Sequence, residues 1–234
     1  RSWSPETVVR WIDELVEKHG VRNIRIEDDN FLLDLKRVES ICDRLIERKH
    51  DLNLWCYGRV QLYPRELLGK MKRAGFNWIC LGIESAKGKT PHDSKDCVRS
   101  IQRAGILVIG NYMFGLPGER QEDMEATLKM ALELRCEYVN LYSAMALPGS
   151  KLYGGGTKAD RNRGWETYSQ LGYECVPAGT DYLSPREVLA FRDHAFRAYH
   201  TDPSYLSMIE QKFGGKVRKY IQEMSKKDIP RLCV

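Results

Sequence analysis

Three consecutive carboxylates, Glu27, Asp28 and Asp29, follow a short strand-like segment at residues 23–26. If that stretch is a strand, its side chains alternate between the two faces, so neighbouring carboxylates point in opposite directions. One interpretation is a solvated loop with an N-cap for the next helix. The other is a site for a ligand ammonium group or a divalent metal ion, because carboxylates hold both. The residues alone leave both interpretations open.

Ligand-type residues also follow four later apolar stretches. Arg59 ends one of them, and its planar guanidinium suits a carboxylate or phosphate, although a surface arginine is the plain alternative. Glu84 and Ser85 end the next and offer a carboxylate and a hydroxyl to a sugar diol or an amino group. The turns at residues 115–118 and 147–150 are rich in glycine and proline, which either lets a ligand approach the backbone or only reverses the chain. Neither turn is a P-loop or a dinucleotide fingerprint.

The seven cysteines are scattered, and the closest pair, Cys42 and Cys56, is fourteen positions apart. No CxxC or CxxxCxxC spacing exists, so no metal site is expected within this chain. An odd number of scattered cysteines does not suggest a secreted disulfide scaffold, and Cys56 and Cys80 lie in apolar stretches where a thiol acts as a small hydrophobe. The pattern therefore predicts a reducing, cytoplasmic location.

The elements that must position these residues alternate regularly. Ser4, Pro5 and Glu6 are typical of a helix start. Strands are expected near residues 23–26, 52–57, 78–81, 106–114 and 138–142, each with a helical pattern before the next strand. Strand–helix units at intervals of about 25–30 residues indicate a parallel sheet, either open and doubly wound or closed into a full or partial barrel. Both layouts place ligands at the carboxyl ends of the strands.

Beyond the fifth strand the pattern changes. Residues 154–183 are rich in glycine and polar residues and are expected to form an irregular crossing loop. The sequence Ser-Pro-Arg-Glu at 184–187 predicts a capped helix start, and helical patterns continue from there. We therefore divide the chain into an α/β barrel-type region at 1–153, the loop at 154–183 and a C-terminal helical cap at 184–234.

Composition excludes several classes of protein. The 234 residues carry 37 basic and 32 acidic side chains, a net charge of +5. The basic clusters at 70–73 and 216–219 mix with apolar residues, which is typical of a solvated helix face, so no nucleic-acid partner is expected. No apolar run approaches the ~20 residues of a membrane span, so no membrane association is expected.

Five sequence motifs in this order resemble the radical S-adenosylmethionine (radical SAM) superfamily, and within it the cobalamin (B12)-dependent class. They are IEDDNF at 26–31, WCYGRV at 55–60, GIESA at 82–86, GLPGE at 115–119 and YSAMALPGSKLY at 142–153. The stretch 182–199 also resembles the tail that follows the barrel in this class. The resemblance implies an α/β fold, a partial (β/α)6 TIM-like barrel of which strands 2–6 are present, with a C-terminal helical extension.

The resemblance also implies an activity and its cofactors. S-adenosylmethionine and a [4Fe–4S] cluster would generate a 5′-deoxyadenosyl radical, and cobalamin would take part in methyl transfer. Asp28 and Asp29 would meet the amino group of S-adenosylmethionine, Arg59, Glu84 and Ser85 its carboxylate or ribose, and the later turns its adenine. The implied cofactor-binding residues are Asp28, Asp29, Arg59, Glu84, Ser85, Tyr112, Gly115, Pro117, Gly118, Met145 and Leu147. Tyr112 is expected to project into the barrel mouth with Asn140 and Tyr142.

One departure from the family is that the cluster motif CxxxCxxC is absent. We expect those cysteines, the first barrel strand and any cobalamin domain to lie upstream of Arg1, so that this chain alone is inactive in radical chemistry. The expected partners are a small-molecule substrate and a reductant such as flavodoxin or ferredoxin. Two alternatives remain: a metal-dependent barrel lyase or aldolase that uses Glu27, Asp28 and Asp29, and a degenerate barrel that binds a nucleotide without turnover.

Overall fold

The structure, a computed structural model, describes residues 2–87, 91–155 and 164–232. Its described strands form one five-stranded parallel sheet in the order β1-β2-β3-β4-β5. They are β1 (Asn23–Ile26), β2 (Asn53–Arg59), β3 (Phe76–Glu84), β4 (Leu107–Phe114) and β5 (Tyr138–Ser143). The predicted fold class, an α/β partial TIM-like barrel, is confirmed.

The chain divides into two compact units. Unit 1 contains Arg1–Ile83, Thr90–Gly110 and Cys136–Val139, and unit 2 contains Glu84–Lys89, Asn111–Arg135 and Asn140–Val234. Unit 1 therefore holds β1, β2 and nearly all of β3, whereas unit 2 holds the carboxyl ends of β4 and β5. We describe each unit by itself.

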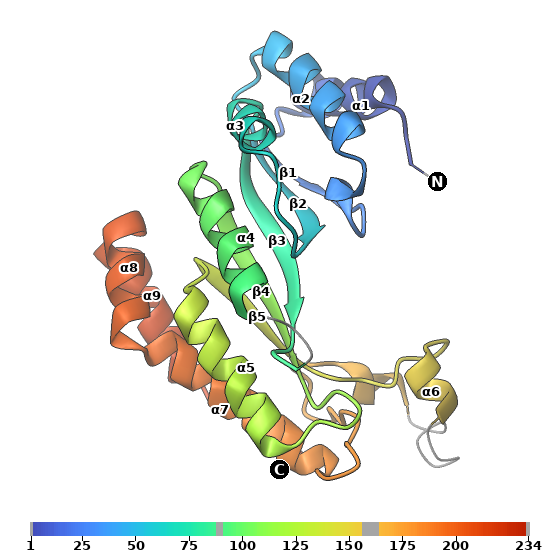
Figure 1. Ribbon diagram of the computed structural model, residues 1–234, viewed down its shortest axis with the longest axis vertical. Coiled ribbons are helices and arrows are strands. Elements are labelled where there is room, and N and C mark those ends of the chain that lie inside the picture. The colour runs from blue at the N-terminus through green and yellow to red at the C-terminus, as the bar shows by residue number, and fades with distance from the viewer. Residues whose placement is uncertain (1, 88–90, 156–163, 233–234) are drawn as a thin grey trace. The chain divides into compact units, whose positions relative to one another are not determined.

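In unit 1 the helices start and stop where local chemistry dictates. Helix α1 (Pro5–His19) begins after Ser4, whose side chain accepts a hydrogen bond from the Thr7 N–H, and ends at Gly20 in the left-handed conformation. The next helices are η1 (Phe31–Leu33), α2 (Leu35–Arg48), α3 (Arg65–Arg73) and α4 (Pro91–Arg103). Figure 1 shows α1, α2 and α3 packed next to one another.

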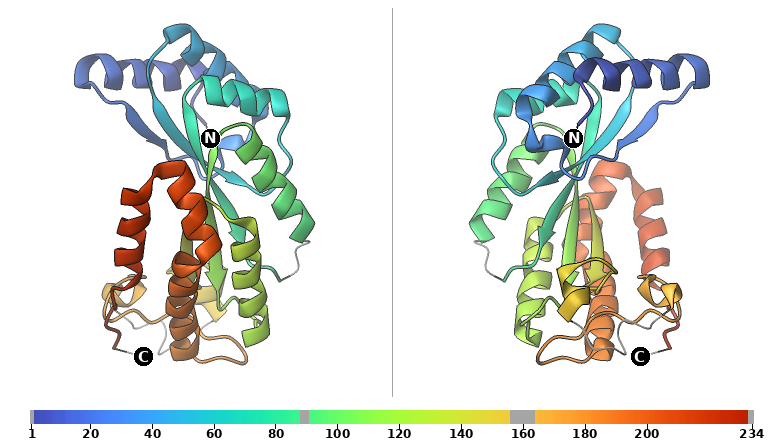
Figure 2. Two further views of the ribbon diagram at one scale, coloured as in Figure 1. Left: turned by 90° about the vertical axis from the view of Figure 1, so that its left-hand side faces the viewer. Right: turned by 90° about the vertical axis from the view of Figure 1, so that its right-hand side faces the viewer.

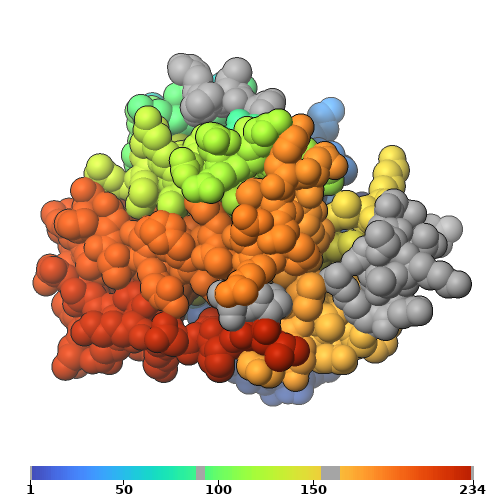
Figure 3. Space-filling model, turned by 90° about the horizontal axis from the view of Figure 1, so that it is seen from below, coloured from blue at the N-terminus to red at the C-terminus, as the bar shows by residue number. Residues whose placement is uncertain are grey.

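Unit 2 is dominated by helices. Helix α5 (Gln121–Leu134) packs against α7 (Pro185–Thr201), and the two lie side by side in Figure 3. Helix α7 is capped by Ser184 and Glu187, which confirms the predicted helix start. Helices α8 (Pro203–Phe213) and α9 (Gly215–Ser225) follow and pack on α7 and on each other (Figure 2). Two short helices, α6 (Lys151–Gly155) and η3 (Trp165–Tyr168), precede α7.

Burial alternates residue by residue along β2, β4 and β5. In β2, Leu54, Cys56 and Gly58 are buried, whereas Trp55 and Tyr57 are only half-buried; β4 shows the same alternation over its whole length. A parallel sheet covered on both faces would be buried throughout. The alternation therefore means that one face carries the closely packed core while the other is more open, as expected for the inner face of a partial barrel.

The next observations concern the predicted domain boundaries, the expected crossing loop and membrane-spanning helices. The predicted domain boundaries at 153/154 and 183/184 remain predictions. Residues 156–163 of the expected crossing loop lie outside the described residues, and the rest of that stretch contains η3. No helix in the described part of the chain is long and apolar enough to cross a membrane.

Candidate functional site

At the end of β1, Asp28 is tied to the protein. Its carboxylate Oδ2 lies 2.8 Å from Nη1 of Arg37 in α2, and the same guanidinium donates through Nε to the carbonyl oxygen of Trp3 at 2.9 Å. Asp28 thus fixes the strand end to α2 and to the segment ahead of α1. The neighbouring Asp29 is exposed. Of the two predicted site residues, Asp29 is the one whose carboxylate is accessible to a ligand.

The three carboxylates do not converge. Glu27 forms an ion pair with Arg25 of β1, while Asp28 is held by Arg37. Within the described ranges, no group of three or more His, Cys, Asp or Glu side chains is placed to hold a metal ion. The metal-dependent lyase or aldolase alternative therefore finds no ligand set at Glu27, Asp28 and Asp29.

The end of β2 presents Arg59 on a fixed backbone. A Cβ on the preceding Gly58 would lie 2.7 Å from Cδ1 of Leu32 and 3.1 Å from Oη of Tyr63, so any larger residue would displace these side chains. The Tyr63 hydroxyl donates to the carbonyl oxygen of Arg59 at 2.6 Å, and burial raises the pKa of Tyr63, which keeps this hydroxyl a donor. The Arg59 side chain is exposed. The fixed backbone sets the point from which the exposed Arg59 guanidinium can reach an anionic ligand.

The end of β3 has an unusual backbone. Glu84 is half-buried and adopts a left-handed conformation, with φ 67°. Outside glycine, such a value is uncommon away from helix C-termini and calls for an explanation. The next residue, Ser85, is buried, and its hydroxyl contacts Glu119 and lies 3.3 Å from Oγ1 of Thr127. That hydroxyl is used inside the protein, so a role in positioning Glu84 fits Ser85 better than contact with a ligand.

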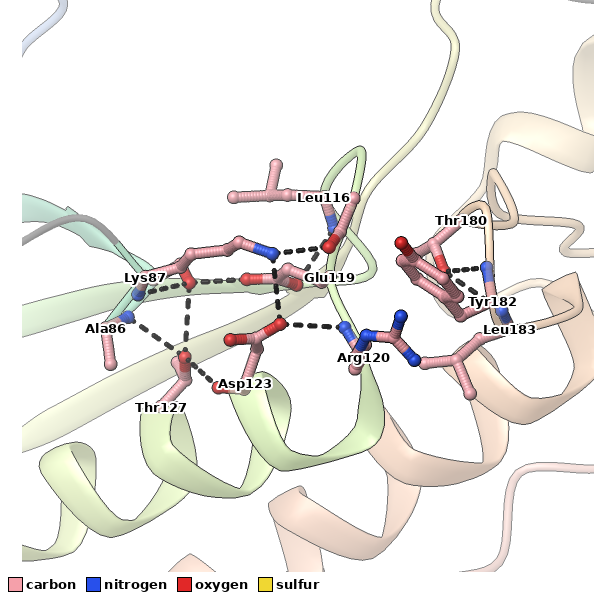
Figure 4. A network of polar contacts seen from close by, with 12 residues as sticks. Ala86, Lys87, Leu116, Glu119, Arg120, Asp123, Thr127, Thr180, Tyr182 and Leu183 are labelled. Carbon is pink, nitrogen blue, oxygen red and sulfur yellow. Dashed lines mark hydrogen bonds and ion pairs between the residues drawn. The ribbon is translucent and has the colours of Figure 1, made fainter.

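Glu119 was not among the predicted site residues. Its carboxylate is completely buried; Oε2 accepts hydrogen bonds from the backbone N–H groups of Gly115 (2.9 Å) and Leu116 (3.0 Å), and Oε1 accepts one from the Ser85 hydroxyl. Figure 4 shows the carboxylate between the two turns. The GLPGE motif contains the signal, because a glutamate four residues after the first glycine can reach back to its N–H group.

A second set of contacts reinforces the same two turns. The Lys87 ammonium lies 3.0 Å from Oδ2 of Asp123 and donates to the carbonyl oxygen of Gly118. Thr127 Oγ1 accepts a hydrogen bond from the Ala86 N–H at 3.0 Å. Hydrogen bonding from the Arg120 N–H and from Lys87 lowers the pKa of Asp123, so its carboxylate stays ionised at neutral pH. The residues after β3 and those after β4 are therefore joined by side chains in unit 2 (Figure 4).

Of the predicted turn residues after β4, some are accessible and one is packed. Pro117 is exposed, and a Cβ on Gly118 would have no atom closer than 3.9 Å. A Cβ on Gly115 would lie 2.4 Å from Cγ1 of Val188 in α7. Gly115 thus serves helix packing, and Pro117 and Gly118 are the parts of the turn that a ligand can reach.

The placement of Tyr112 corrects the expectation that it projects into the barrel mouth. It is fully buried on the same face of β4 as Phe114, whose ring lies 5.3 Å from that of Phe191 in α7. Because side chains alternate along a strand, Asn111 rather than Tyr112 lies on the more open face. There the Asn140 side chain donates a hydrogen bond to Oδ1 of Asn111 at 2.9 Å.

Met145 and Leu147 follow β5. Met145 is half-buried and Leu147 is exposed. The segment is held close to the end of β4 because the Ala144 N–H donates to the carbonyl oxygen of Phe114 at 2.8 Å. Unit 2 therefore brings together the turn after β3, the turn after β4 and the segment after β5, while Asp28, Asp29 and Arg59 lie in unit 1.

Comparison with known proteins identifies the family. The model of the radical SAM superfamily matches residues 1–131, more than half of the chain. The chain belongs to the radical SAM superfamily. The matched region contains four of the five strand ends, including Asp29, Arg59, Glu84 and Glu119.

Two relatives of this chain have names that state an activity. An uncharacterized methyltransferase of Pyrococcus horikoshii is 32% identical over 165 residues, which are 65% of this chain and 36% of the relative. An anaerobic magnesium-protoporphyrin IX monomethyl ester cyclase of Cereibacter sphaeroides is 30% identical over 149 residues, 58% of this chain and 24% of the relative. The chain thus spans only about a quarter to a third of these radical SAM relatives.

A solved structure supports the fold. The radical S-adenosylmethionine methyltransferase TsrM from Kitasatospora setae, with cobalamin and a [4Fe–4S] cluster bound, aligns with a TM-score of 0.56 at 21% identity. The alignment covers 62% of this chain and 29% of that protein. At this level of identity the likeness shows the α/β partial-barrel fold alone.

Proposed function

We propose that this chain is the greater part of the barrel of a radical SAM methyltransferase and that it binds S-adenosylmethionine at the carboxyl ends of its strands. Membership of the superfamily carries the proposal, because the family match includes the strand ends that bear the accessible ligand-type residues. The names of the Pyrococcus relative and of TsrM favour methyl transfer.

The residues at these strand ends suit the polar groups of S-adenosylmethionine. In unit 1, the exposed Asp29 suits its ammonium group and the exposed Arg59 its carboxylate. Next to Asp29, Oδ1 of Asn30 is buried and accepts no hydrogen bond within the described part of the chain, which leaves an acceptor for a ligand N–H. In unit 2, Glu84 suits the ribose diol, and the region of Pro117, Gly118, Met145 and Leu147 offers backbone and apolar surface to the adenine.

The described cysteines do not fit a [4Fe–4S] cluster. All six are buried thiols outside any disulfide, and burial raises the pKa of Cys42 to about 12 and that of Cys97 to about 11, so both stay protonated. We propose that the ligands of the cluster and the site of cobalamin lie outside these 234 residues, and that this chain alone is inactive. A flavodoxin- or ferredoxin-type protein is the proposed electron donor, and a small molecule the substrate.

S-adenosylmethionine supplies a transferable methyl group and, on one-electron cleavage, a 5′-deoxyadenosyl radical. The contribution of this chain is to bind and orient it. Asp29 and Arg59, both in unit 1, would hold the charged methionine end through opposite charges. A cofactor whose charged end is held presents its sulfonium in fewer orientations, which favours selective bond cleavage.

Titration calorimetry with S-adenosylmethionine tests the binding proposal. We expect the wild-type chain to bind and Asp29→Ala or Arg59→Ala to bind about tenfold more weakly, because each loses a charge-assisted contact. Glu14→Ala, which changes an exposed residue of α1 paired with Lys18, is the control and should bind like wild type. Equal affinity in wild type and Asp29→Ala would remove the proposed role of Asp29.

The reaction type is tested on a longer form of the protein that includes the upstream sequence, reconstituted anaerobically. Methyl transfer predicts S-adenosylhomocysteine whose formation depends on added cobalamin. Production of 5′-deoxyadenosine without S-adenosylhomocysteine would instead favour ring-forming chemistry of the kind named for the Cereibacter relative.

A further inference from the structure

We propose that Glu119 is a positioning residue for the cofactor site and that it acts through Ser85 on Glu84. The inference rests on the proposed function, because it assigns Glu84 to S-adenosylmethionine. Its basis is the buried hydrogen-bond network that joins the turn after β3 to the turn after β4 in unit 2 (Figure 4).

The backbone after Glu84 is held at three successive residues. The Ser85 hydroxyl contacts Glu119 and accepts a hydrogen bond from the Lys87 N–H at 3.1 Å, and the Ala86 N–H donates to Oγ1 of Thr127 at 3.0 Å. A left-handed conformation at a glutamate persists only when its surroundings determine it. These contacts supply that determination for Glu84.

Glu119 carries the link because it serves both turns at once. One carboxylate oxygen accepts two backbone N–H groups of the GLPG turn, and the other accepts the Ser85 hydroxyl. Buried carboxylates are costly unless all their acceptor positions are used, and here the acceptors are shared between two segments. The direction of the Glu84 carboxylate and the shape of the turn at Pro117 and Gly118 are therefore set by the same group.

Ser85→Ala is the sharpest variant, because it removes the linking hydroxyl and leaves the contacts of Glu119 with the GLPG turn in place. We expect it to bind S-adenosylmethionine about fivefold to tenfold more weakly, the loss of one well-placed hydrogen bond. Glu119→Ala should weaken binding at least as much. Glu119→Gln should stay within about threefold of wild type, because a glutamine amide can accept from the turn and donate to the Ser85 hydroxyl.

A double-mutant cycle separates positioning from direct contact. If Ser85 and Glu119 act through Glu84, then Glu84→Ala combined with Ser85→Ala binds like Glu84→Ala alone, within about twofold. Additive losses would mean that Ser85 touches the cofactor itself, and would overturn the inference. Wild-type affinity in Glu84→Ala would instead remove the role of Glu84 on which the inference rests.

Glu137 supplies a matched structural control. It is likewise buried, and its carboxylate accepts the Val108 N–H at 2.7 Å and the Gln102 side chain at 3.0 Å, at the amino-terminal ends of β4 and β5. Glu137→Ala should lower the unfolding temperature as Glu119→Ala does, yet leave the affinity for S-adenosylmethionine within about twofold. Equal affinity losses in both variants would show a general loss of structure and overturn the inference.

Discussion

The backbone conformation of Glu84 lowers the stability of the folded state. Its φ of 67° lies in the left-handed region, which costs a side chain with a Cβ on the order of 1 kcal/mol. The other two described non-glycine residues with positive φ, Lys49 and Arg135, are helix C-caps, where this conformation is common. Glu84 ends a strand, so the helix-cap explanation does not apply to it.

Replacing Glu84 by glycine should separate stability from binding. Glycine adopts positive φ freely, so we expect Glu84→Gly to be more stable than Glu84→Ala by about 1 kcal/mol, measured by urea unfolding. Both variants should lose affinity for S-adenosylmethionine. Arg135→Gly is the control: its free energy of unfolding should exceed that of the wild type by a similar amount, and its affinity for S-adenosylmethionine should stay unchanged. A Glu84→Gly chain less stable than Glu84→Ala would contradict the assignment of strain.

At this scale the sequence predicted residue types better than their orientation. Glu84 and Arg59 could be chosen because an acid or a base follows an apolar strand. The orientation of Tyr112 depends on which face of β4 meets α7, and that contact comes from residues more than seventy positions later, such as Phe191. The link from Glu119 to Ser85 was missed for the same reason, since the two residues are thirty-four positions apart.

The turn after β4 and helix α7 fit together with no spare volume. A Cβ on Gly115 would meet Val188 at 2.4 Å, and φ there is 79°. Gly115→Ala should therefore lose about 3 kcal/mol of unfolding free energy, from overpacking and backbone strain together. At Gly149, φ is 85° and no atom lies within 4 Å of an added Cβ. Gly149→Ala should therefore lose only about 1 kcal/mol of unfolding free energy. Similar losses in both would show that packing against α7 contributes little.

Helix α7 also holds the C-terminal segment through a buried charge cluster. Arg231 pairs with Asp193 at 3.0 Å and donates to the carbonyl oxygens of Gln170 and Gly172, and Arg192 pairs with the same carboxylate at 2.6 Å. Burial alone would raise the pKa of Asp193, but hydrogen bonds from Arg231 and Arg192 outweigh it, so the pKa is lowered. The ionised form is therefore the one that the fold stabilises.

This cluster predicts an acid-dependent stability. A carboxyl with a lowered folded-state pKa stabilises the fold above its unfolded-state pKa, near 3.8, and loses that contribution as the pH falls through the folded value. Asp193→Asn should therefore lose less unfolding free energy than wild type between about pH 4 and pH 2. Arg231→Ala should show the same flattened profile. Parallel profiles in wild type and Asp193→Asn would contradict the assignment.

Among the elements, helix ends were the most predictable part. The caps at Ser4 and Ser184 are formed by hydrogen bonds to residues three positions along the chain, and both helices begin where the sequence indicated. Strand β3 is longer than predicted, Phe76–Glu84, because its pairing with β2 includes residues outside the apolar stretch. The short helices η1 and α6 have no periodic pattern long enough to reveal them.

For the whole chain, the cysteines predict a chemical behaviour. The six described ones are buried, and burial raises the pKa of Cys56 well above its usual range. We expect these six to react with a thiol reagent only in denaturant, and iron and sulfide to assemble no [4Fe–4S] cluster on this chain. Absorbance near 410 nm that persists after gel filtration, in stoichiometric amount, would refute this.

The order of the strands has a consequence for synthesis. Each strand from β2 to β5 is hydrogen-bonded to the strand that precedes it in the sequence. On the ribosome, every newly emerged strand therefore finds its neighbour already outside the exit tunnel, and the sheet can lengthen one strand at a time as translation proceeds. Slow codons placed just after each strand–helix pair would then help folding, whereas the same codons inside a strand would expose an unpaired edge for longer.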